Sequence, residues 1–446
     1  MVLQFYLKYN YIINSFLFKK ISFIFSIIYI DFPKYKFNIF FFWKMVLNFY
    51  KCILLIFLII LCYGFKIESK NKFYNPFNSQ QTKNFKGFFA IGILLHHLGY
   101  MGEYSQNSKY VIPKYHIGYP MVGIFFFFSG FGIMTNFLNK KDYLKGFLKK
   151  RLITVLIPFY LINTLYGILF YKTRNQYFFQ NTPLCVGKNN KNLKYILTTF
   201  LGYTPAYQNG WYCISISLLY IVFYITFRLI KNHWINIFII FIYISWTILY
   251  GKNNKGFGWF KGPHWHKSTF SFLYGILIAK YEKQVITFLK QFYIIALPIS
   301  TFTFLFICHY EKTEKLSLWI TNQKFYFGKT EIRKYIIEHI ISHLFCISSI
   351  NLIHILSMKI FFNNSILEHL GNISYEIYLY HTFFIYFLRK KIIEVSHDGF
   401  YVFFNFFFSL YTAKIMRKVN QFLINLLISK KKVMTNNYLK INNELV

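Results

Sequence analysis

Apolar segments of membrane-spanning length recur along the chain, and short polar or basic connections separate them. They extend from residue 49 to residue 428 and are apolar on all sides. Because an α-helix needs about 20 apolar residues to cross ~30 Å of hydrocarbon, this pattern predicts a polytopic membrane protein. A transmembrane β-barrel would instead alternate apolar and polar positions, so the pattern argues against that class. The predicted spans are approximately 86–104, 118–137, 152–171, 211–230, 234–250, 268–281, 289–308, 335–357, 370–388 and 399–428.

The expected fold is therefore an all-α membrane bundle of about ten transmembrane helices in a lipid bilayer, with no soluble domain. A further apolar stretch at 52–65 raises the count to eleven if it also spans the bilayer. Residues 1–84 are predicted to be an N-terminal extension and residues 85–429 the membrane domain. Residues 430–446 are predicted to form a basic and polar cytoplasmic tail.

Charge refines the topology. The chain carries 51 Lys and Arg against 14 Asp and Glu, a formal net charge of +37. This charge lies mostly between apolar segments, where it orients helices, so we expect no nucleic-acid partner. The basic connection "NKKDYLKGFLKKR" at 139–151 is predicted to be cytoplasmic. A multi-pass protein of the plasma membrane with a cytoplasmic C-terminus follows, although the basic residues at 252–267 and 389–391 then lie outside, against the rule.

Metal-binding patterns are weak. The six cysteines are scattered, without a Cys-x-x-Cys pair or another metal-ligand spacing. In "EHIISHLF", His339 and His343 stand at i and i+4, which suits a metal, but a third ligand is lacking. We therefore interpret these two histidines as packing or water-lined residues and expect no metal.

Ionisable residues inside apolar segments are costly, and they are the first candidates for function. In "FKGFFAIGILLHHLGY" at 85–100, Lys86 and His97 are eleven positions apart, which leaves them only ~20° apart around a helix. Their Cα atoms are then separated by roughly 16 Å along the axis, with Lys86 at the cytoplasmic end. His96 points ~80° away from Lys86. An alternative interpretation is that Lys86 reaches the interface and the histidines bond to neighbouring carbonyls.

A second candidate face lies near the C-terminus. In "SYEIYLYH", Ser374, Tyr378 and His381 occupy positions i, i+4 and i+7 of one helix, so they share a face. This face presents two hydroxyls and an imidazole to a cavity, or else belongs to an interfacial belt of aromatic residues.

These elements together resemble the acyltransferase-3 family, integral membrane O-acyltransferases that modify bacterial surface glycans. "KGFFAIGILLHH" is similar to the family's first-helix signature of a basic residue, ten positions and a histidine, with lysine where arginine is commoner. The segments "VGIFFFFSGFGIMTNF", "YLKGFLKKRLITVLIPFYL", "NGWYCISISLLY" and "LGNISYEIYLYHTFFIYF" resemble four further family elements, in the family's order.

The resemblance implies transfer of an acyl group, expected to be acetyl, from acetyl-CoA or another acyl-CoA to a hydroxyl of a surface or exported polysaccharide. His97 is then expected to act as general base or to carry the acyl group briefly. The other expected catalytic residues are Ser374, Tyr378 and His381. The expected cofactor-binding residues are Lys86, Lys149, Lys150 and Arg151, and the expected substrate residues are Glu103, Ser129 and Trp211.

Several of these residues also have structural interpretations. Ser129 lies among glycines that favour close helix packing, and the cluster at 149–151 also serves to orient the protein. A transporter or flippase for a glycan or lipid-linked intermediate would also explain intramembrane histidine and tyrosine, but the paired broken helices of inverted repeats are not evident. A catalytically silent member with a sensing or scaffold role is the third alternative.

Overall fold

The computed structural model describes residues 53–69 in part, 72–105, 108, 110–112, 118–173, 210–253, 267–313, 330–389, 393 and 395–443. The predicted N-terminal extension up to residue 52 and the connections at 174–209, 254–266 and 314–329 lie outside the described residues. Parts of the additional helix predicted at 52–65 also lie outside them.

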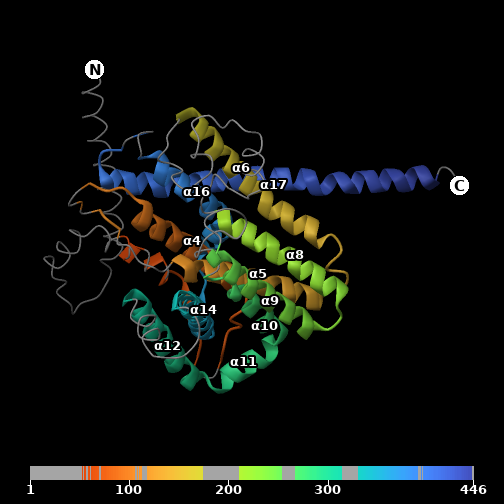
Figure 1. Cartoon of the computed structure of the whole chain (residues 1–446), viewed down its shortest axis with the longest axis horizontal. Coiled ribbons are helices and arrows are strands. Elements are labelled where there is room, and N and C mark those ends of the chain that lie inside the picture. Colours follow the sequence, from red (N-terminus) through yellow and green to blue (C-terminus); the bar gives the residue numbers. More distant parts are fainter. Residues whose placement is uncertain are drawn as a thin grey trace. The chain divides into compact units, whose positions relative to one another are not determined.

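Helices make up nearly all of the described chain, which confirms the predicted all-α class (Figure 1). A small antiparallel pair of strands, β1 and β2, joins Phe65 to Phe362 and was not predicted. The elements are β1 (Phe65–Ile67), α4 (Ser79–Met101), α5 (Gly118–Asn139), α6 (Phe147–Thr173), α8 (Trp211–Leu229), α9 (His233–Asn253), α10 (Phe270–Lys280), α11 (Glu282–Gln291), α12 (Tyr293–Thr313), α14 (Thr330–Ser357), β2 (Ile360–Phe362), α15 (Ser365–Asn372), α16 (Ser374–Phe387) and α17 (Asp398–Asn443).

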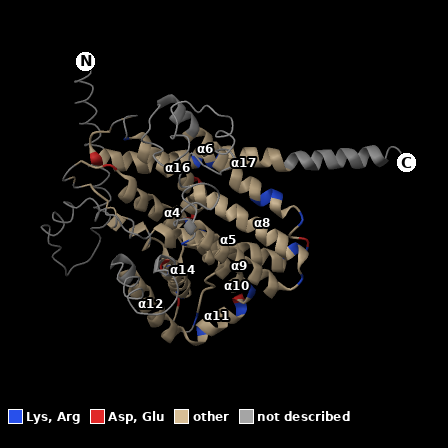
Figure 2. Ribbon diagram, viewed as in Figure 1, with Lys and Arg blue, Asp and Glu red and all other residues tan. Residues whose placement is uncertain are grey.

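Four described helices are long and apolar enough to cross a membrane: α5, α8, α9 and α14. The pair α11 and α12 passes the same test together but is bent by 99°, so up to five spans are supported among the described residues. The count of ten spans stays a prediction. Lys and Arg lie mainly at helix ends and in connections, as in a protein whose helical middles face lipid (Figure 2).

Two predicted spans are broken. The span predicted at 289–308 is interrupted at Phe292, where α11 ends and α12 begins. The span predicted at 370–388 is interrupted at Ile373, between α15 and α16. Hydropathy failed here because α11 and α15 are short amphipathic helices that continue into apolar ones without a polar connection.

The short helix α15 fixes the start of α4 through close backbone contact. A Cβ atom added to Gly371 would lie 1.9 Å from the carbonyl oxygen of Lys83, and one added to Gly87 would lie 2.1 Å from that of Leu367. Glycine is therefore required at both positions, and the contact holds Lys86 in a constant place relative to α15 and α16.

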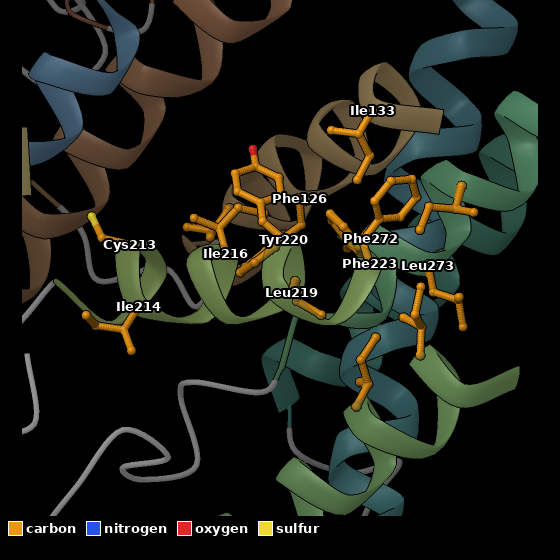
Figure 3. Packing of buried hydrophobic residues seen from close by; sticks show 14 of the residues in the cluster. Phe126, Ile133, Cys213, Ile214, Ile216, Leu219, Tyr220, Phe223, Phe272 and Leu273 are labelled. Carbon is orange, nitrogen blue, oxygen red and sulfur yellow. The ribbon is translucent and has the colours of Figure 1, made fainter. Parts of the chain in front are cut away.

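The apolar core of the described domain lies around α8. Phe126 and Tyr220 face one another across α5 and α8, and Phe223 packs beside Phe272 of α10 (Figure 3). Tyr220 is only 6% exposed, yet its hydroxyl lies within hydrogen-bonding distance of Ser129. The core therefore includes one polar contact at the wall of the cavity described below.

Helices α5 and α10 approach closely enough to make a stability prediction. A Cβ atom added to Gly130 would lie 2.0 Å from the carbonyl oxygen of Phe272, whereas one added to Gly132 would meet nothing within 4 Å. Gly130→Ala must push the helices apart and is expected to destabilise the fold by about 1–3 kcal/mol. Gly132→Ala is the matched control and should lie within about 0.5 kcal/mol of wild type or above it. Equal unfolding midpoints in detergent for the two variants would contradict the close approach.

Candidate active site

One cavity of about 350 Å³ lies between six helices of the described domain. Its wall combines apolar side chains, tyrosines and cations. The residues lining it are Lys86, Ile93, Val122, Phe125, Phe128, Ser129, Gly132, Asn136, Arg151, Thr154, Val155, Tyr212, Ile216, Tyr220, Ser374, Tyr375, Tyr378 and Arg417. Along α5 alone the lining runs from Val122 to Asn136, about 21 Å at 1.5 Å per residue. The cavity is therefore elongated along the helices.

Positive charge concentrates in the wall of this cavity. Lys86 comes from α4, Arg151 from α6 and Arg417 from α17. The Nη2 of Arg151 donates to the hydroxyl of Tyr143 at 2.9 Å, and the Lys86 Nζ lies 5.7 Å from the ring centroid of Phe128. Among the residues lining the cavity none is acidic. An anion is therefore the ligand that this wall is built to attract.

Two histidines meet just beyond the lining. The rings of His97 and His381 are 5.0 Å apart between centroids. His97 follows the lining residue Ile93 by about one turn of α4, and His381 follows Tyr378 by three residues of α16. Helix geometry therefore places the histidine pair next to one part of the cavity and roughly 16 Å along α4 from Lys86.

The hydrogen bonds of the pair leave nitrogen atoms available. His381 is fully buried, and its Nδ1 lies 3.0 Å from the carbonyl oxygen of Ile377. A carbonyl only accepts, so Nδ1 carries the proton and Nε2 is an acceptor. Among the described residues, neither the Nε2 of His381 nor the Nδ1 of His97 has a partner. Both nitrogen atoms are therefore able to bond with a group bound beside the pair.

The site residues predicted from the sequence fall into three groups: residues that line the cavity, the histidine pair beside it, and residues outside it. Lys86, Arg151, Ser129, Ser374 and Tyr378 line the cavity. His97 and His381 form the adjacent pair. Four others do not line the cavity: Glu103, Lys149, Lys150 and Trp211.

The four residues outside the cavity have other surroundings. Lys149 and Lys150 are exposed, and the Nζ of Lys149 donates to the carbonyl oxygen of Leu427 at 3.0 Å. Trp211 packs with Phe126, and Glu103 is exposed just after the end of α4. The structure therefore favours Arg151, rather than its two neighbours, as the anion-binding residue of that cluster.

Ser374 and Tyr378 are also separated by the structure. The Ser374 hydroxyl donates to the carbonyl oxygen of Gly371 at 2.8 Å, and Gly371 packs against α4 before Lys86. Ser374 is about 10 Å from His381 along α16, at the level of Lys86. Tyr378 is nearer, with its ring centroid 6.2 Å from that of His381. Of the two residues, Tyr378 is the one whose ring lies at the histidine end.

Arg417 and the tyrosines of α8 were missed by the sequence interpretation. Arg417 stood among basic residues that seemed only to set the topology of the C-terminal segment. Its position in an apolar helix, thirteen residues before the lysine run at 430–432, is a signal that was available. Tyr212 and Tyr220 offered no such signal, because tyrosine is abundant throughout the chain.

His339 and His343 of α14 lie beside aromatic rings. His339 lies against the ring of Tyr335 and His343 against the ring of Phe270, with centroids 4.4 and 4.8 Å apart. In the part of the chain that the structure describes, no three His, Cys, Asp or Glu side chains converge on one metal position.

A polar network ties together the helix ends that follow the histidine pair. Asp398, the first residue of α17, accepts from the guanidinium of Arg389 and from both the backbone N–H and the hydroxyl of Ser105. Arg389 also lies over the ring of Tyr401, 4.5 Å from its centroid. The Tyr401 hydroxyl donates to the carbonyl oxygen of Ile385 at 3.2 Å. Helices α4, α16 and α17 are thereby held at one end.

Comparison with known proteins identifies the family of the chain. No match was found among curated proteins or among solved structures. A model of the acyltransferase-3 family, described as an acyltransferase domain, matches residues 83–415. This match contains α4 with Lys86 and His97, as well as α16 with His381, and it covers most of the chain. The chain therefore belongs to the acyltransferase-3 family and is a membrane acyltransferase.

Proposed function

We propose that the chain transfers an acetyl group from acetyl-CoA to a hydroxyl of a surface or exported glycan at the plasma membrane. The observation that supports this proposal best is the combination of a cationic cavity and an adjacent histidine pair. A thioester donor with phosphates needs both features, one to bind its charged part and one to act at its reacting carbon.

The donor fits the dimensions of the cavity. A volume of about 350 Å³ is near the lower end for ligand pockets, so it suits a narrow arm better than a whole nucleotide. In this proposal the pantetheine arm lies among the tyrosines, and the phosphates meet Lys86 and Arg151. The predicted topology puts this cationic end on the cytoplasmic side, where acyl-CoA is made.

The histidine pair supplies the proton chemistry. His97 accepts the proton of the acceptor hydroxyl as its oxygen bonds to the thioester carbon, and the C–S bond then breaks. The departing sulfur takes up a proton, so that free CoA thiol and an acetyl ester are the products. Tyr378 donates to the carbonyl oxygen as negative charge develops there. The Nε2 of His381 accepts a hydrogen bond at the same place and orients the neighbouring groups.

The acceptor is proposed to approach from the opposite, outer side. Glu103 lies exposed at that end of α4, and Trp211 begins α8 at the same level in the predicted topology. A carboxylate and an aromatic ring are suited to hydrogen bonding and stacking with a sugar. Because neither residue lines the described cavity, acceptor and donor enter by different routes in this proposal.

Acetyl transfer in isolated membranes tests the function. Membranes from cells with and without the gene are incubated with acetyl-labelled acetyl-CoA, and both thiol release and labelled glycan are measured. We expect both signals only when the chain is present, together with loss of O-acetyl groups from surface glycans in cells that lack it. A transporter or flippase would consume no thioester. If export of the glycan depends on the gene but no CoA thiol is released, the proposal is refuted.

A further inference from the structure

Arg417 lies between the cavity and a buried carboxylate. It is on α17, lines the cavity with Lys86 and Arg151, and its side chain is 38% exposed. Its Nη1 lies 3.5 Å from the Oε1 of Glu376, whose side chain is only 1% exposed. One side of the arginine therefore faces an ion-pair partner, and another faces the cavity.

Glu376 is placed to orient this arginine. Its Oε1 also accepts from the Nδ2 of Asn420 at 3.1 Å, one turn further along α17. Its Oε2 has no hydrogen-bond partner among the described residues. A buried carboxylate is costly unless it is paired, so the attraction between Glu376 and Arg417 is retained in a setting of weak screening. The guanidinium is thereby held in one position at the wall.

The charges of this group leave an excess. Three cations line the cavity, and one carboxylate lies behind Arg417, so two positive charges are uncompensated among these four residues. Like charges that share a cavity repel one another unless an anion lies between them. A ligand with about two negative charges, such as a pyrophosphate or a phosphate monoester, matches this excess.

We propose that Arg417 is a binding residue for the phosphates of the acyl donor and that Glu376 and Asn420 position it. This rests on the proposed function, which it extends by assigning to α17 the recognition of a phosphorylated donor over an unphosphorylated one. The guanidinium is suited to this role because its planar set of donors matches two phosphate oxygens at once.

The test compares two donors that share the same thioester. Acetyl-CoA carries phosphates, whereas acetyl-pantetheine lacks them. For Arg417→Gln in purified full-length protein in phosphatidylcholine nanodiscs, we expect kcat/KM for acetyl-CoA to fall by roughly 10- to 100-fold, mainly through KM. The value for acetyl-pantetheine should change less than about twofold. Glu376→Gln should produce a smaller loss of the same selectivity.

Lys418→Gln is the matched control. It removes one positive charge from the next residue of α17, which is exposed and does not line the cavity. We expect this variant to keep the wild-type preference for acetyl-CoA. If Arg417→Gln lowers kcat/KM equally for acetyl-CoA and acetyl-pantetheine, the arginine has a structural role and the inference is overturned. The inference is also overturned if Arg417→Gln prefers acetyl-CoA as strongly as Lys418→Gln does.

Two further outcomes separate the inference from its basis. If wild-type protein turns over neither donor, the proposed function itself fails. If the effect of Arg417→Gln appears only when phosphatidylglycerol is added to the nanodiscs, the anion is a lipid phosphate and the inference is refuted. If the preference for acetyl-CoA depends on Arg417 in nanodiscs of phosphatidylcholine alone, the anion bound by Arg417 is the phosphate of the acyl donor, which supports the inference.

Discussion

A His97→Ala variant is expected to lose about 10²- to 10⁴-fold in acetyl transfer, the range typical for removal of a general base. The acceptor hydroxyl is a poor nucleophile until its proton is taken up, and His97 is proposed to receive that proton. The loss should fall on kcat, because the donor phosphates are proposed to bind roughly 16 Å away along α4, at Lys86. Donor KM should therefore change little.

His96 provides the control for this variant. It is adjacent in sequence, but its ring is directed toward the start of α5, where a Cβ atom added to Gly118 would lie 2.4 Å from its Nε2. Initial rates of thiol release are measured for His96→Ala and His97→Ala at matched protein levels in membranes. Similar rates for the two variants, or a His97→Ala rate above a tenth of wild type, would exclude His97 as the base.

His381→Ala tests the partner of this base. The carbonyl of Ile377 fixes the tautomer of His381, so its Nε2 accepts at the reacting end. We expect a reduction in kcat that is not additive with that of His97→Ala, since residues that act as a unit lose their effect together. Additive losses in the double variant would mean that the two rings act independently.

The sequence alone predicts much of the fold, because membrane helices are dictated by local hydropathy. Helices α5, α8, α9 and α14 lie close to their predicted bounds. The interruptions at Phe292 and Ile373 were not predictable in this way. A bend leaves the average polarity of a segment unchanged, so hydropathy does not reveal it. The packing of Gly371 on Lys83, which accompanies α15, is a tertiary contact that local sequence does not encode.

In the candidate site too, features within one helix could be predicted, whereas features that depend on packing between helices could not. Lys86 and His97 belong to one helix, so their separation follows from helix geometry and could be calculated from the sequence. The approach of His381 to His97 and the lining of the cavity by Arg417 depend on how α4, α16 and α17 pack. No periodicity within a single segment contains that information. A family resemblance selected His381 but gave no reason to select Arg417.

The second large effect is expected at the opposite end of these helices. The Asp398→Asn substitution removes the charge partner of the Arg389 guanidinium. Both side chains are buried, with Arg389 12% exposed and Asp398 3% exposed. Removing one member of a buried ion pair typically costs about 3–5 kcal/mol, because the remaining charge stays buried without compensation. The ends of α4, α16 and α17 should then loosen, and activity should fall with the folded fraction.

The same ion pair predicts an acid-sensitive stability. Asp398 precedes the predicted span 399–428, at its outer end. Burial would raise the pKa of Asp398, but hydrogen bonds from Ser105 and Ser108 and the charge of Arg389 lower it below its ordinary value of 3.8. Because the folded pKa is the lower one, the stabilisation is complete above about pH 4 and is lost as the pH falls through the folded pKa.

Unfolding by sodium dodecyl sulfate in mixed micelles, measured at pH 7 and at pH 3, checks both expectations. The control is Glu368→Gln, which breaks the ion pair between Glu368 and Lys83. The Glu368 side chain is 31% exposed and the Lys83 side chain is 44% exposed. A pair so open to solvent contributes about 0–1 kcal/mol, so this variant should remain near wild type. Asp398→Asn should be far less stable than the control at pH 7. The gap between these two variants should narrow at pH 3, where the stabilisation that the Asp398 carboxylate gives the control is partly lost. A constant gap between the two variants at both pH values would show that the carboxylate charge is not what stabilises these helix ends.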